Sequence, residues 1–353
     1  MKPFFSIIIP CCDVEPYVKE CLMSVVNQPF QDWECIIGIE ASKDKTEEVI
    51  RELTANDSRF RIFTGPRSGS CSASRNTGID MAQGEYIIFL DGDDTIVEGS
   101  LQRLHDKIAA RPGADLYPCA MLVYDDVTKN ELEVRDNYSN DAPTELTGPE
   151  ATLLTERGCG HHPCPMLQLT VHKRQFLMAH NLKCIHGLRR QDSEFSPRAL
   201  YLAKRVVPLH DNFYLYRIRQ NAVGSSAHGS RYFHGDWAII LKSLFAFHAK
   251  ASQEDGFDTR VSQAWGRQWL SWLFFFWFAP NNVKMIPRQK RLDTLQVIFS
   301  DGFDDFNMLL KTNSVTRQIA GKLVYLYVKC SAIRAFVELF FRLYFFFSTT
   351  RTT

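Results

Sequence analysis

The stretch from Glu85 to Ile96, EYIIFLDGDDTI, places three carboxylates directly after an apolar, strand-forming run. Asp91, Asp93 and Asp94 repel one another, and each makes the others harder to ionise. A bound cation is the usual compensation, because carboxylate oxygens suit Mg²⁺ or Mn²⁺ and leave ligand positions open for phosphates. The structural alternative is an acidic turn in which Asp94 and Thr95 cap the helix that follows.

Two other interpretations of this stretch concern calcium and phosphate chemistry. An EF-hand loop that began at Asp91 would need glycine at its sixth position, where Ile96 stands. The D-x-D-x-T pattern also fits the haloacid-dehalogenase phosphatases, with Asp91 as the nucleophile. Those enzymes usually carry the motif on the first strand of the core, whereas here it would follow the fourth. The EF-hand is therefore excluded, and the phosphatase stays as an alternative function.

Strand-like and helix-like segments alternate along the first 125 residues. Apolar runs predict strands at 5–9, 35–39, 60–63, 86–90 and 116–124. Apolar residues at helical spacing predict helices that begin near Pro16, Asp44, Ser72 and Leu101. This alternation predicts an α/β fold, with a mostly parallel sheet and helices on both faces. Because ligands bind such sheets at the carboxyl ends of the strands, we expect three acidic strand ends, after Pro10, at Glu40 and at Asp91, to form one cleft.

The rest of the chain has a different character. Residues 125–165 are polar and irregular, which predicts loops and an edge strand. The segment LRRQDSEFSPRALYLA, 188–203, predicts a loop that runs into a helix. From about residue 230 the sequence becomes helical and aromatic, as in QWLSWLFFFWFAP and AIRAFVELFFRLYFFF.

Composition narrows the class of protein. With 353 residues, 45% of them hydrophobic, the chain can bury a proper core, and its formal net charge of +1 argues against nucleic acid as a partner. The ten cysteines have irregular spacing, so we expect reduced thiols in a cytoplasmic protein. The first apolar run is too short for a signal peptide, and no segment reaches the ~20 uninterrupted apolar residues of a spanning helix.

Several motifs together resemble the family 2 inverting glycosyltransferases of the GT-A, nucleotide-diphospho-sugar-transferase fold. They occur in family order over roughly residues 4–226, about two thirds of the chain. The resemblance is carried by FSIIIPCCDVEPYVKECLMSVVNQPFQDWECIIGIEASKDKT, SCSASRNTGIDMAQGEYIIFLDGDD, VHKRQFLMAHNLKC, RRQDSEFSPRAL and FYLYRIRQNAVGSS.

The resemblance implies a role for each matching position. The residues expected at the base and ribose are Pro10, Cys12, Asp13, Glu40, Asp44 and Asp91. The residues expected on the diphosphate side are Ser74, Arg75 and Asn76. Asp93 matches the ligand of a metal, Mn²⁺ or Mg²⁺, that bridges the diphosphate. Asp192 stands where the family has its general base, with Glu194 as the second candidate; from spacing alone, Asp192 is equally an N-cap.

The sequence departs from the family pattern at three places. Ile39-Glu40-Ala41-Ser42 replaces the usual Asp-Asp-Gly-Ser, so the charge is kept on a longer side chain. Cys12-Asp13 replaces the usual Tyr-Asn, which removes an aromatic ring from the base site. Gln191-Asp192 replaces an acidic pair. The departures concern the donor nucleotide more than the reaction.

The resemblance also implies an organisation and a function. Residues 1–125 would form the nucleotide-sugar-binding half and 126–229 the acceptor-binding half of one GT-A domain, followed by a helical extension, 230–353. The implied function is metal-dependent, inverting transfer from a nucleotide sugar, UDP-linked, to a hydroxyl of a glycan or lipid-linked acceptor in cell-surface polysaccharide synthesis. A non-catalytic nucleotide-sugar-binding subunit of a glycan assembly complex is the alternative that involves no reaction.

Three further features have two interpretations each. Cys159, His161, His162 and Cys164 could ligate zinc or form a loop near the acceptor. Arg217 and Arg219 could bind phosphates or simply alternate along an exposed strand. Residues 322–347 predict one long helix, in which Arg334, Glu338 and Arg342 would support one another.

The surroundings of that predicted helix are basic. From Asn281 onward there are eleven lysines and arginines against five acids. The helix would therefore either pack on the rest of the chain or on a second copy, or lie peripherally on the inner face of the cell membrane.

Overall fold

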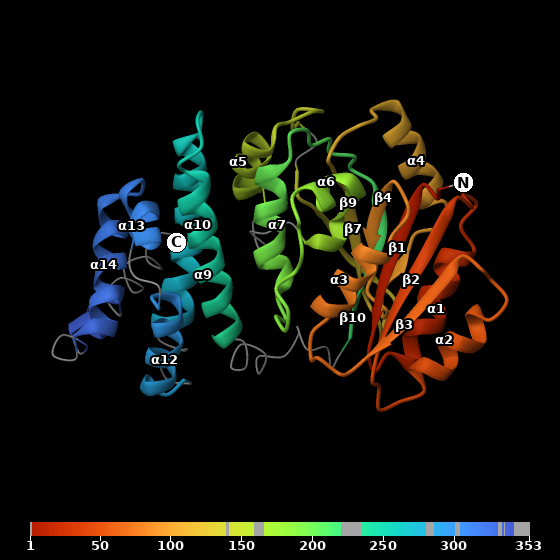
Figure 1. Cartoon of the computed structure of the whole chain (residues 1–353), viewed down its shortest axis with the longest axis horizontal. Coiled ribbons are helices and arrows are strands. Elements are labelled where there is room, and N and C mark those ends of the chain that lie inside the picture. The colour runs from red at the N-terminus through yellow and green to blue at the C-terminus, as the bar shows by residue number, and fades with distance from the viewer. Residues whose placement is uncertain are drawn as a thin grey trace. The chain divides into compact units, whose positions relative to one another are not determined.

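The structure is a computed structural model that describes residues 2–138, 141–158, 166–219, 234–279, 286–300, 304–330, 334 and 336–341. The chain divides into two compact units, Met1–Ser225 and Ser226–Thr353. Within the described residues, the first unit contains all the strands and the second contains helices only (Figure 1).

The strands of the first unit are β1 Phe5–Cys11, β2 Trp33–Glu40, β3 Phe60–Gly65, β4 Tyr86–Phe89, β5 Thr95–Ile96, β6 Leu116–Pro118, β7 Ala120–Asp125, β8 Glu131–Asp136, β9 Thr170–Lys173 and β10 Asn212–Ile218. Its helices are α1 Glu15–Val26, α2 Thr46–Thr54, α3 Ser72–Met81, α4 Ser100–Ala110, α5 Gly148–Gly158, the 3₁₀ turn η1 Leu167–Leu169, α6 Arg174–Ala179 and α7 Gln191–Leu202.

The main sheet has six strands in the order β3-β2-β1-β4-β9-β6. Strands β1 to β4 are parallel to their neighbours within that group, and β9 runs antiparallel to both β4 and β6. A sheet with four parallel strands, each joined to the next through a helix, confirms the predicted α/β class.

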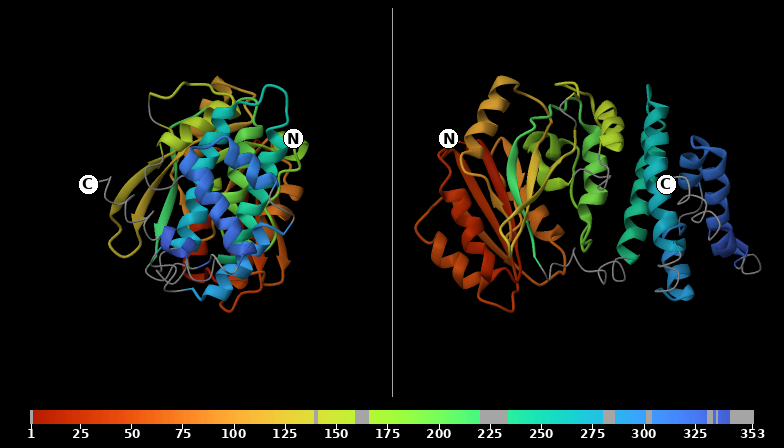
Figure 2. Two further views of the ribbon diagram at one scale, coloured as in Figure 1. Left: turned by 90° about the vertical axis from the view of Figure 1, so that its left-hand side faces the viewer. Right: turned by 180° about the vertical axis from the view of Figure 1, so that it is seen from behind.

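The side chains of β1 alternate between two cores because successive residues of a strand point to opposite faces. Ile7 and Ile9 belong to one core, which also takes buried residues of α1, α2 and α4. Ile8 belongs to the other, with residues of α3, α5, α6 and α7. Figures 1 and 2 show the same layering, with α1 and α2 on one side of the sheet and α3, α6 and α7 on the other. Both faces are covered, as predicted.

A second sheet, in the order β5-β10-β7-β8, corrects the strand predicted at 116–124. The chain changes sheets at Cys119, whose N–H bonds to Leu169 O, while the next N–H, of Ala120, bonds to Asp211 O. One apolar run therefore becomes two strands, β6 and β7, because its backbone finds different partners on either side of this residue.

The region 125–165 also differs in part from the loops that were predicted. It contains β8, which lies at the edge of the second sheet with most side chains exposed, as an edge strand was expected to. It also contains α5, which the polar composition did not reveal. The residues between 159 and 165, including all four candidate zinc ligands, lie outside the described residues.

The second unit is helical, as the sequence predicted. Its helices are α9 His234–Ala251, α10 Thr259–Phe278, α12 Arg288–Ile298, α13 Asp304–Lys311 and α14 Val315–Lys329. Aromatic rings form its core, and the rings of Trp265 and Trp269 stack with centroids 4.9 Å apart. Over the stretches that the structure describes, no helix combines the length and the apolar character that crossing a membrane requires.

The single long helix predicted over 322–347 is wrong. Helix α14 ends at Lys329, and Cys330 has an extended backbone, with φ −127° and ψ 109°. Glu338 accepts a hydrogen bond from the Tyr327 hydroxyl at 2.8 Å and pairs with Arg288 and Arg291, both from α12. These tertiary contacts replace the expected pairing of Glu338 within one helix.

Candidate functional site

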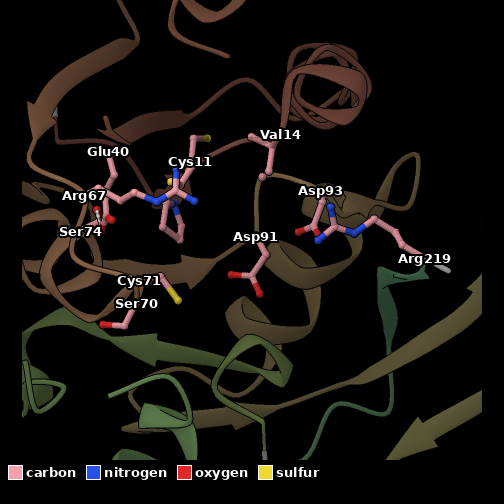
Figure 3. Close-up of a pocket in the computed structure, with 14 residues that line it drawn as sticks. Cys11, Val14, Glu40, Arg67, Ser70, Cys71, Ser74, Asp91, Asp93 and Arg219 are labelled. Carbon is pink, nitrogen blue, oxygen red and sulfur yellow. Dashed lines mark hydrogen bonds and ion pairs between the residues drawn. The ribbon is translucent and has the colours of Figure 1, made fainter. Parts of the chain in front are cut away.

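A cleft of about 370 Å³ lies at the carboxyl ends of β1, β2 and β4. Its lining residues come from five segments that are distant in the sequence (Figure 3). They are Pro10, Cys11, Cys12, Val14, Glu40, Arg67, Gly69, Ser70, Cys71, Ser74, Asp91, Gly92, Asp93 and Arg219. The three strand ends predicted to converge therefore line one cavity, since parallel strands end at the same edge of their sheet.

Asp91 is held firmly at the inner side of the cleft. Arg75, only 1% exposed, forms an ion pair with Oδ1, and the Gln168 amide donates to Oδ2 at 2.8 Å. Burial by itself would lower the pKa of the Arg75 guanidinium, but the Asp91 charge beside it raises that pKa above its usual range. Both carboxylate oxygens of Asp91 are thus engaged, which is unlike a nucleophile ready to attack phosphate.

The turn after β4 packs tightly against β1 because residue 92 is glycine. A Cβ at this position would lie 2.9 Å from the Cys11 sulfur, which is too close for a normal contact. Asp94 points inward, where the Tyr214 hydroxyl and the Arg217 N–H donate to it at 2.6 and 2.8 Å. Burial, together with Asp93 and Asp91, raises the pKa of Asp94 well above its usual value. Asp94 therefore anchors β10 and caps no helix.

Asp93 faces the cleft and forms an ion pair with Arg219 at 2.6 Å (Figure 3). Burial, and next the charge of Asp91, raise the pKa of Asp93 above its usual value, and the Arg219 charge opposes this. Among the described residues no group of three or more metal-ligating side chains occurs. Asp93 supplies one carboxylate, and its ionised form is stabilised by a nearby positive charge. It is therefore suited to a cation that takes its other ligands from a diphosphate.

Arg217, the other arginine of this strand, has a structural position. Its side chain is buried and donates to Asp126 and Glu20 at 2.6 Å, and to the Asp93 carbonyl at 2.8 Å. Of the two arginines considered as phosphate ligands, only Arg219 lines the cleft.

The far end of the cleft contains Glu40 and Arg67, and Asp13 lies against Arg67. Glu40 is buried and accepts hydrogen bonds from the N–H and hydroxyl of Ser68 at 2.8 and 2.7 Å. Asp13 pairs with Arg67 at 2.6 Å, and that hydrogen bond, followed by one from the Lys43 N–H, lowers the pKa of Asp13. The loop after β3 is thus tied to the ends of both β1 and β2.

Four residues expected near the donor do not line this cleft: Asp13, Asp44, Arg75 and Asn76. Asp44 accepts the N–H groups of Glu15 at 3.0 Å and Thr46 at 3.1 Å, so it ties the start of α1 to the start of α2, whose N-cap is Lys45. Asn76 exchanges two 2.8 Å hydrogen bonds with the backbone of Cys184 and joins α3 to that segment. Ser74 does line the cleft, where its hydroxyl lies 3.5 Å from Glu40.

Asp192 is the second residue of α7, whose N-cap is Arg190. It does not line the cleft, but the side-chain amide of its neighbour Gln191 lies 3.1 Å from the sulfur of the lining residue Cys71. The charge of Asp192 is also among those that raise the pKa of Arg75. The start of α7 therefore lies beside the Asp91 end of the cleft, and Asp192 is not an N-cap.

Glu194, the second candidate base, is fully buried. Its carboxylate pairs with Arg198 at 2.7 Å. An internal ion pair of this kind makes a side chain structural, because moving it would leave a buried charge uncompensated.

The sequence did not point to Arg67, Cys71 or Gln168. Arg67 and Cys71 belong to the loop GPRSGSCS, whose glycines and serines signal an irregular segment directly after a strand end. Gln168 lies in η1, far from the other site residues in the chain, and no sequence signal marks it.

Comparison with known proteins gives one family. Residues 6–165 match the family model described as Glycosyl transferase family 2. The uncharacterized glycosyltransferase EpsJ of Bacillus subtilis is 30% identical over 224 residues, which cover 63% of this chain and 63% of EpsJ. The GalNAc(5)-diNAcBac-PP-undecaprenol beta-1,3-glucosyltransferase of Campylobacter jejuni is 32% identical over 106 residues, 30% of this chain and 34% of that enzyme. The chain thus spans less than two thirds of either relative.

Solved structures show the same fold over nearly the whole chain. The crystal structure of S. aureus TarS 1–349 aligns with a TM-score of 0.69 at 20% identity and covers 97% of this chain and 92% of that one. The same protein in complex with UDP-GlcNAc aligns with a TM-score of 0.67 at 19% identity, with the same coverage.

Proposed function

We propose that this chain, which matches the Glycosyl transferase family 2 model over residues 6–165, transfers a sugar from a UDP-linked donor to a hydroxyl group, with inversion at the anomeric carbon. The observation that carries the proposal is the cleft at the ends of β1, β2 and β4, in which Asp91 and Asp93 stand opposite Glu40 and Arg67. A cleft with carboxylates at both ends and arginines beside them suits a nucleoside diphosphate with a metal.

The donor would lie along the cleft with its base near Pro10, Cys12, Asp13 and Glu40. Glu40 is a hydrogen-bond acceptor for base or ribose, and it is already fixed in position by Ser68. Asp91 would accept a hydrogen bond from a ribose hydroxyl while the ion pair with Arg75 holds its carboxylate in place. Ser74 and Arg219 border the space left for the two phosphates.

Asp93 would hold Mn²⁺ or Mg²⁺ together with the phosphates of the donor. When bound, such an ion stabilises the negative charge that grows on the leaving diphosphate. Arg219 can leave Asp93 and pair with a phosphate oxygen, because its guanidinium fork matches both anions.

Asp192 would act as the general base on the acceptor. A carboxylate on the face opposite the leaving group takes the proton of the attacking hydroxyl and makes the reaction inverting. Its position at the start of α7, beside Arg75 and Cys71, supports this role. Glu194 cannot replace it without breaking a buried ion pair.

We propose a separate role for each of three consecutive segments of the chain. Residues 1–125 would bind the donor and 126–229 the acceptor, with 230–353 as a helical extension. The UDP donor is supported by the TarS complex with UDP-GlcNAc, and a lipid-linked acceptor by the name of the Campylobacter jejuni relative. We propose cell-surface polysaccharide synthesis in the cytoplasm, at the inner face of the membrane, where nucleotide sugars meet lipid-linked acceptors.

The test begins with the melting temperature of the full chain in a panel of UDP- and GDP-sugars, with and without Mn²⁺, since a ligand stabilises the state that it binds. The stabilising donor is then assayed for transfer. Asp93→Asn should remove the Mn²⁺-dependent stabilisation, whereas Asp106→Asn, an exposed control outside the cleft, should keep it. Stabilisation by a donor that is never transferred would favour the non-catalytic subunit, and hydrolysis of p-nitrophenyl phosphate would favour the phosphatase.

A further inference from the structure

The helical unit has a cavity of its own, of about 350 Å³, far in the sequence from every residue of the cleft. All its lining side chains are polar: Gln263, Arg267, Thr312, Asn313, Ser314 and Arg317. Within the part of the chain that the structure describes, two of these side chains are arginines and none is acidic. A concave site with two guanidinium groups and no carboxylate is suited to an anion.

The cavity is built by a fixed loop between α13 and α14. Residue 266 of α10 is glycine, and a Cβ there would overlap the Asn313 amide, so only glycine lets the loop come this close. Asn313 Nδ2 donates to Leu309 O at 2.8 Å, and Gln318 donates to Asn313 O at 2.8 Å. The lining residues Thr312 to Ser314 are therefore held in place before any ligand arrives.

Arg317 has unused hydrogen-bonding capacity here. Its Nε is buried and has no hydrogen-bond partner within the part of the chain that the structure describes. Ser314, whose hydroxyl accepts the Arg317 N–H at 3.5 Å, begins α14, so the positive end of that helix dipole also lies at the cavity. Phosphate oxygens would satisfy the guanidinium and benefit from the dipole.

The two helices that border the cavity are entirely basic in their charged residues. Helices α10 and α14 contain no aspartate or glutamate, and their charged side chains are Arg260, Arg267, Arg317, Lys322 and Lys329. Arg260 is paired with Asp258, and Arg317, Lys322 and Lys329 of α14 add positive charge around the site. An anionic surface is the complementary partner.

Exposed apolar side chains stand beside the cavity. Val315, which directly follows Ser314, is 70% exposed, and Ile319, one turn further along α14, is 49% exposed. A soluble phosphate ester gives these side chains nothing to contact. A phosphate at the surface of a bilayer does, because its hydrocarbon lies within reach of apolar residues at the rim.

We propose that this cavity binds the phosphate of an anionic phospholipid headgroup, with Arg267 and Arg317 on the phosphate and with Val315 and Ile319 inserted into the membrane interface. The site does not depend on transferase activity. It would dock the chain on the surface where lipid-linked substrates are found.

Vesicle flotation of the full chain tests the proposal, with phosphatidylcholine alone and with about one third phosphatidylglycerol added. We expect the wild type to float with the anionic vesicles only. The double variant Arg267→Gln/Arg317→Gln should lower the apparent affinity by about tenfold or more, at ~1 kcal/mol for each charge near the surface. The matched control Lys250→Gln/Lys290→Gln removes two exposed charges elsewhere in the unit and should retain binding.

A second variant, Val315→Ser/Ile319→Ser, changes the apolar side chains beside the cavity. Because both side chains are largely exposed, these substitutions should not destabilise the fold. This variant should also lose flotation at an unchanged melting temperature. Equal effects of the arginine and lysine pairs would overturn the proposal, as would a wild type that does not float. A wild type that is stabilised by inorganic phosphate but ignores anionic vesicles would show a soluble ligand and overturn it too.

Discussion

Tyr214 donates its phenolic hydrogen to Asp94 across 2.6 Å, inside the N-terminal unit. The same oxygen accepts the Asp91 N–H at 3.2 Å. One side chain of β10 therefore holds both ends of the acidic turn that follows β4. The second sheet is not merely attached to the first, because it determines where the carboxylates of the cleft lie.

Tyr214→Phe should destabilise the protein by about 1–3 kcal/mol, since it leaves Asp94 buried with one fewer donor. It should also weaken donor binding, because the turn that carries Asp91 and Asp93 loses an anchor. Denaturant unfolding and calorimetric titration of UDP with Mn²⁺ measure the two effects. Tyr216→Phe, on the same strand, is the control, and equal losses in both variants would contradict the anchoring role.

Asp192→Asn should reduce kcat by about 10²–10⁴-fold, the usual contribution of a general base, and should leave donor affinity unchanged. The amide has nearly the same shape but cannot accept a proton from the acceptor. Steady-state kinetics with the donor identified by thermal shift, together with its dissociation constant, separate the two quantities. A variant that keeps most of the wild-type rate would show that the base is another residue.

Glu194→Gln is the comparison for that experiment. Because Glu194 is buried and paired with Arg198, its loss should cost about 3 kcal/mol of unfolding free energy. At a temperature where the variant is folded, its kcat should stay within a few fold of the wild type. A catalytic defect without any loss of stability would reverse the roles assigned to Asp192 and Glu194.

Arg219→Ala should have opposite effects on metal and donor. Without donor, Asp93 loses the cation that competes with Mn²⁺, so the affinity for Mn²⁺ should rise a few fold, as for a partly exposed ion pair. With donor, the loss of a charged hydrogen bond to phosphate should weaken binding by about tenfold or more. Electron paramagnetic resonance of Mn²⁺ measures the first effect and calorimetry the second. Arg67→Ala, at the other end of the cleft, should leave the affinity for Mn²⁺ without donor unchanged.

His172 should make stability fall in acid. Burial lowers its pKa to about 3, whereas in the unfolded chain the pKa is about 6.5. The unfolded state therefore binds a proton first, and the stability present above pH ~6.5 is lost as the pH falls toward ~3, at up to about 1.4 kcal/mol per pH unit.

His172→Leu removes the side chain that binds this proton in the unfolded state. Unfolding free energies measured from pH 7 to pH 4 should fall less steeply in this variant than in the wild type. The exposed His180→Asn should leave the slope unchanged. Identical slopes in all three proteins would mean that His172 does not contribute.

Strand ends could be predicted because they follow from periodicity. Glu40 and Asp91 each terminate a buried apolar run, and parallel strands leave such residues at one edge. The convergence of three acidic ends, the layers on both faces and the helical character of the C-terminal unit were all predictable in this way. No knowledge of side-chain contacts was required.

The direction of a side chain within a helix or turn could not be predicted so well. Asn76 is close in sequence to the cleft residue Ser74, but it points to Cys184, which lies elsewhere in the fold. The same holds for Glu338, whose bonds to α12 and Tyr327 join segments that local propensity does not bring together. Tertiary contacts decide these positions.

Strand β9 has a consequence for anyone who wishes to recombine this protein with a relative. It lies between β4 and β6 and forms hydrogen bonds with both strands. It therefore joins β4, in the half that we propose binds the donor, to the segment that leads into the second sheet. A graft of residues 126–219 alone would thus replace β9 with the strand of the relative, while β4 and β6 on either side of it would remain those of this chain. Chimeras joined in the loop before β6 take both β6 and β9 from the relative. We expect these chimeras to fold and to have the acceptor specificity of the relative.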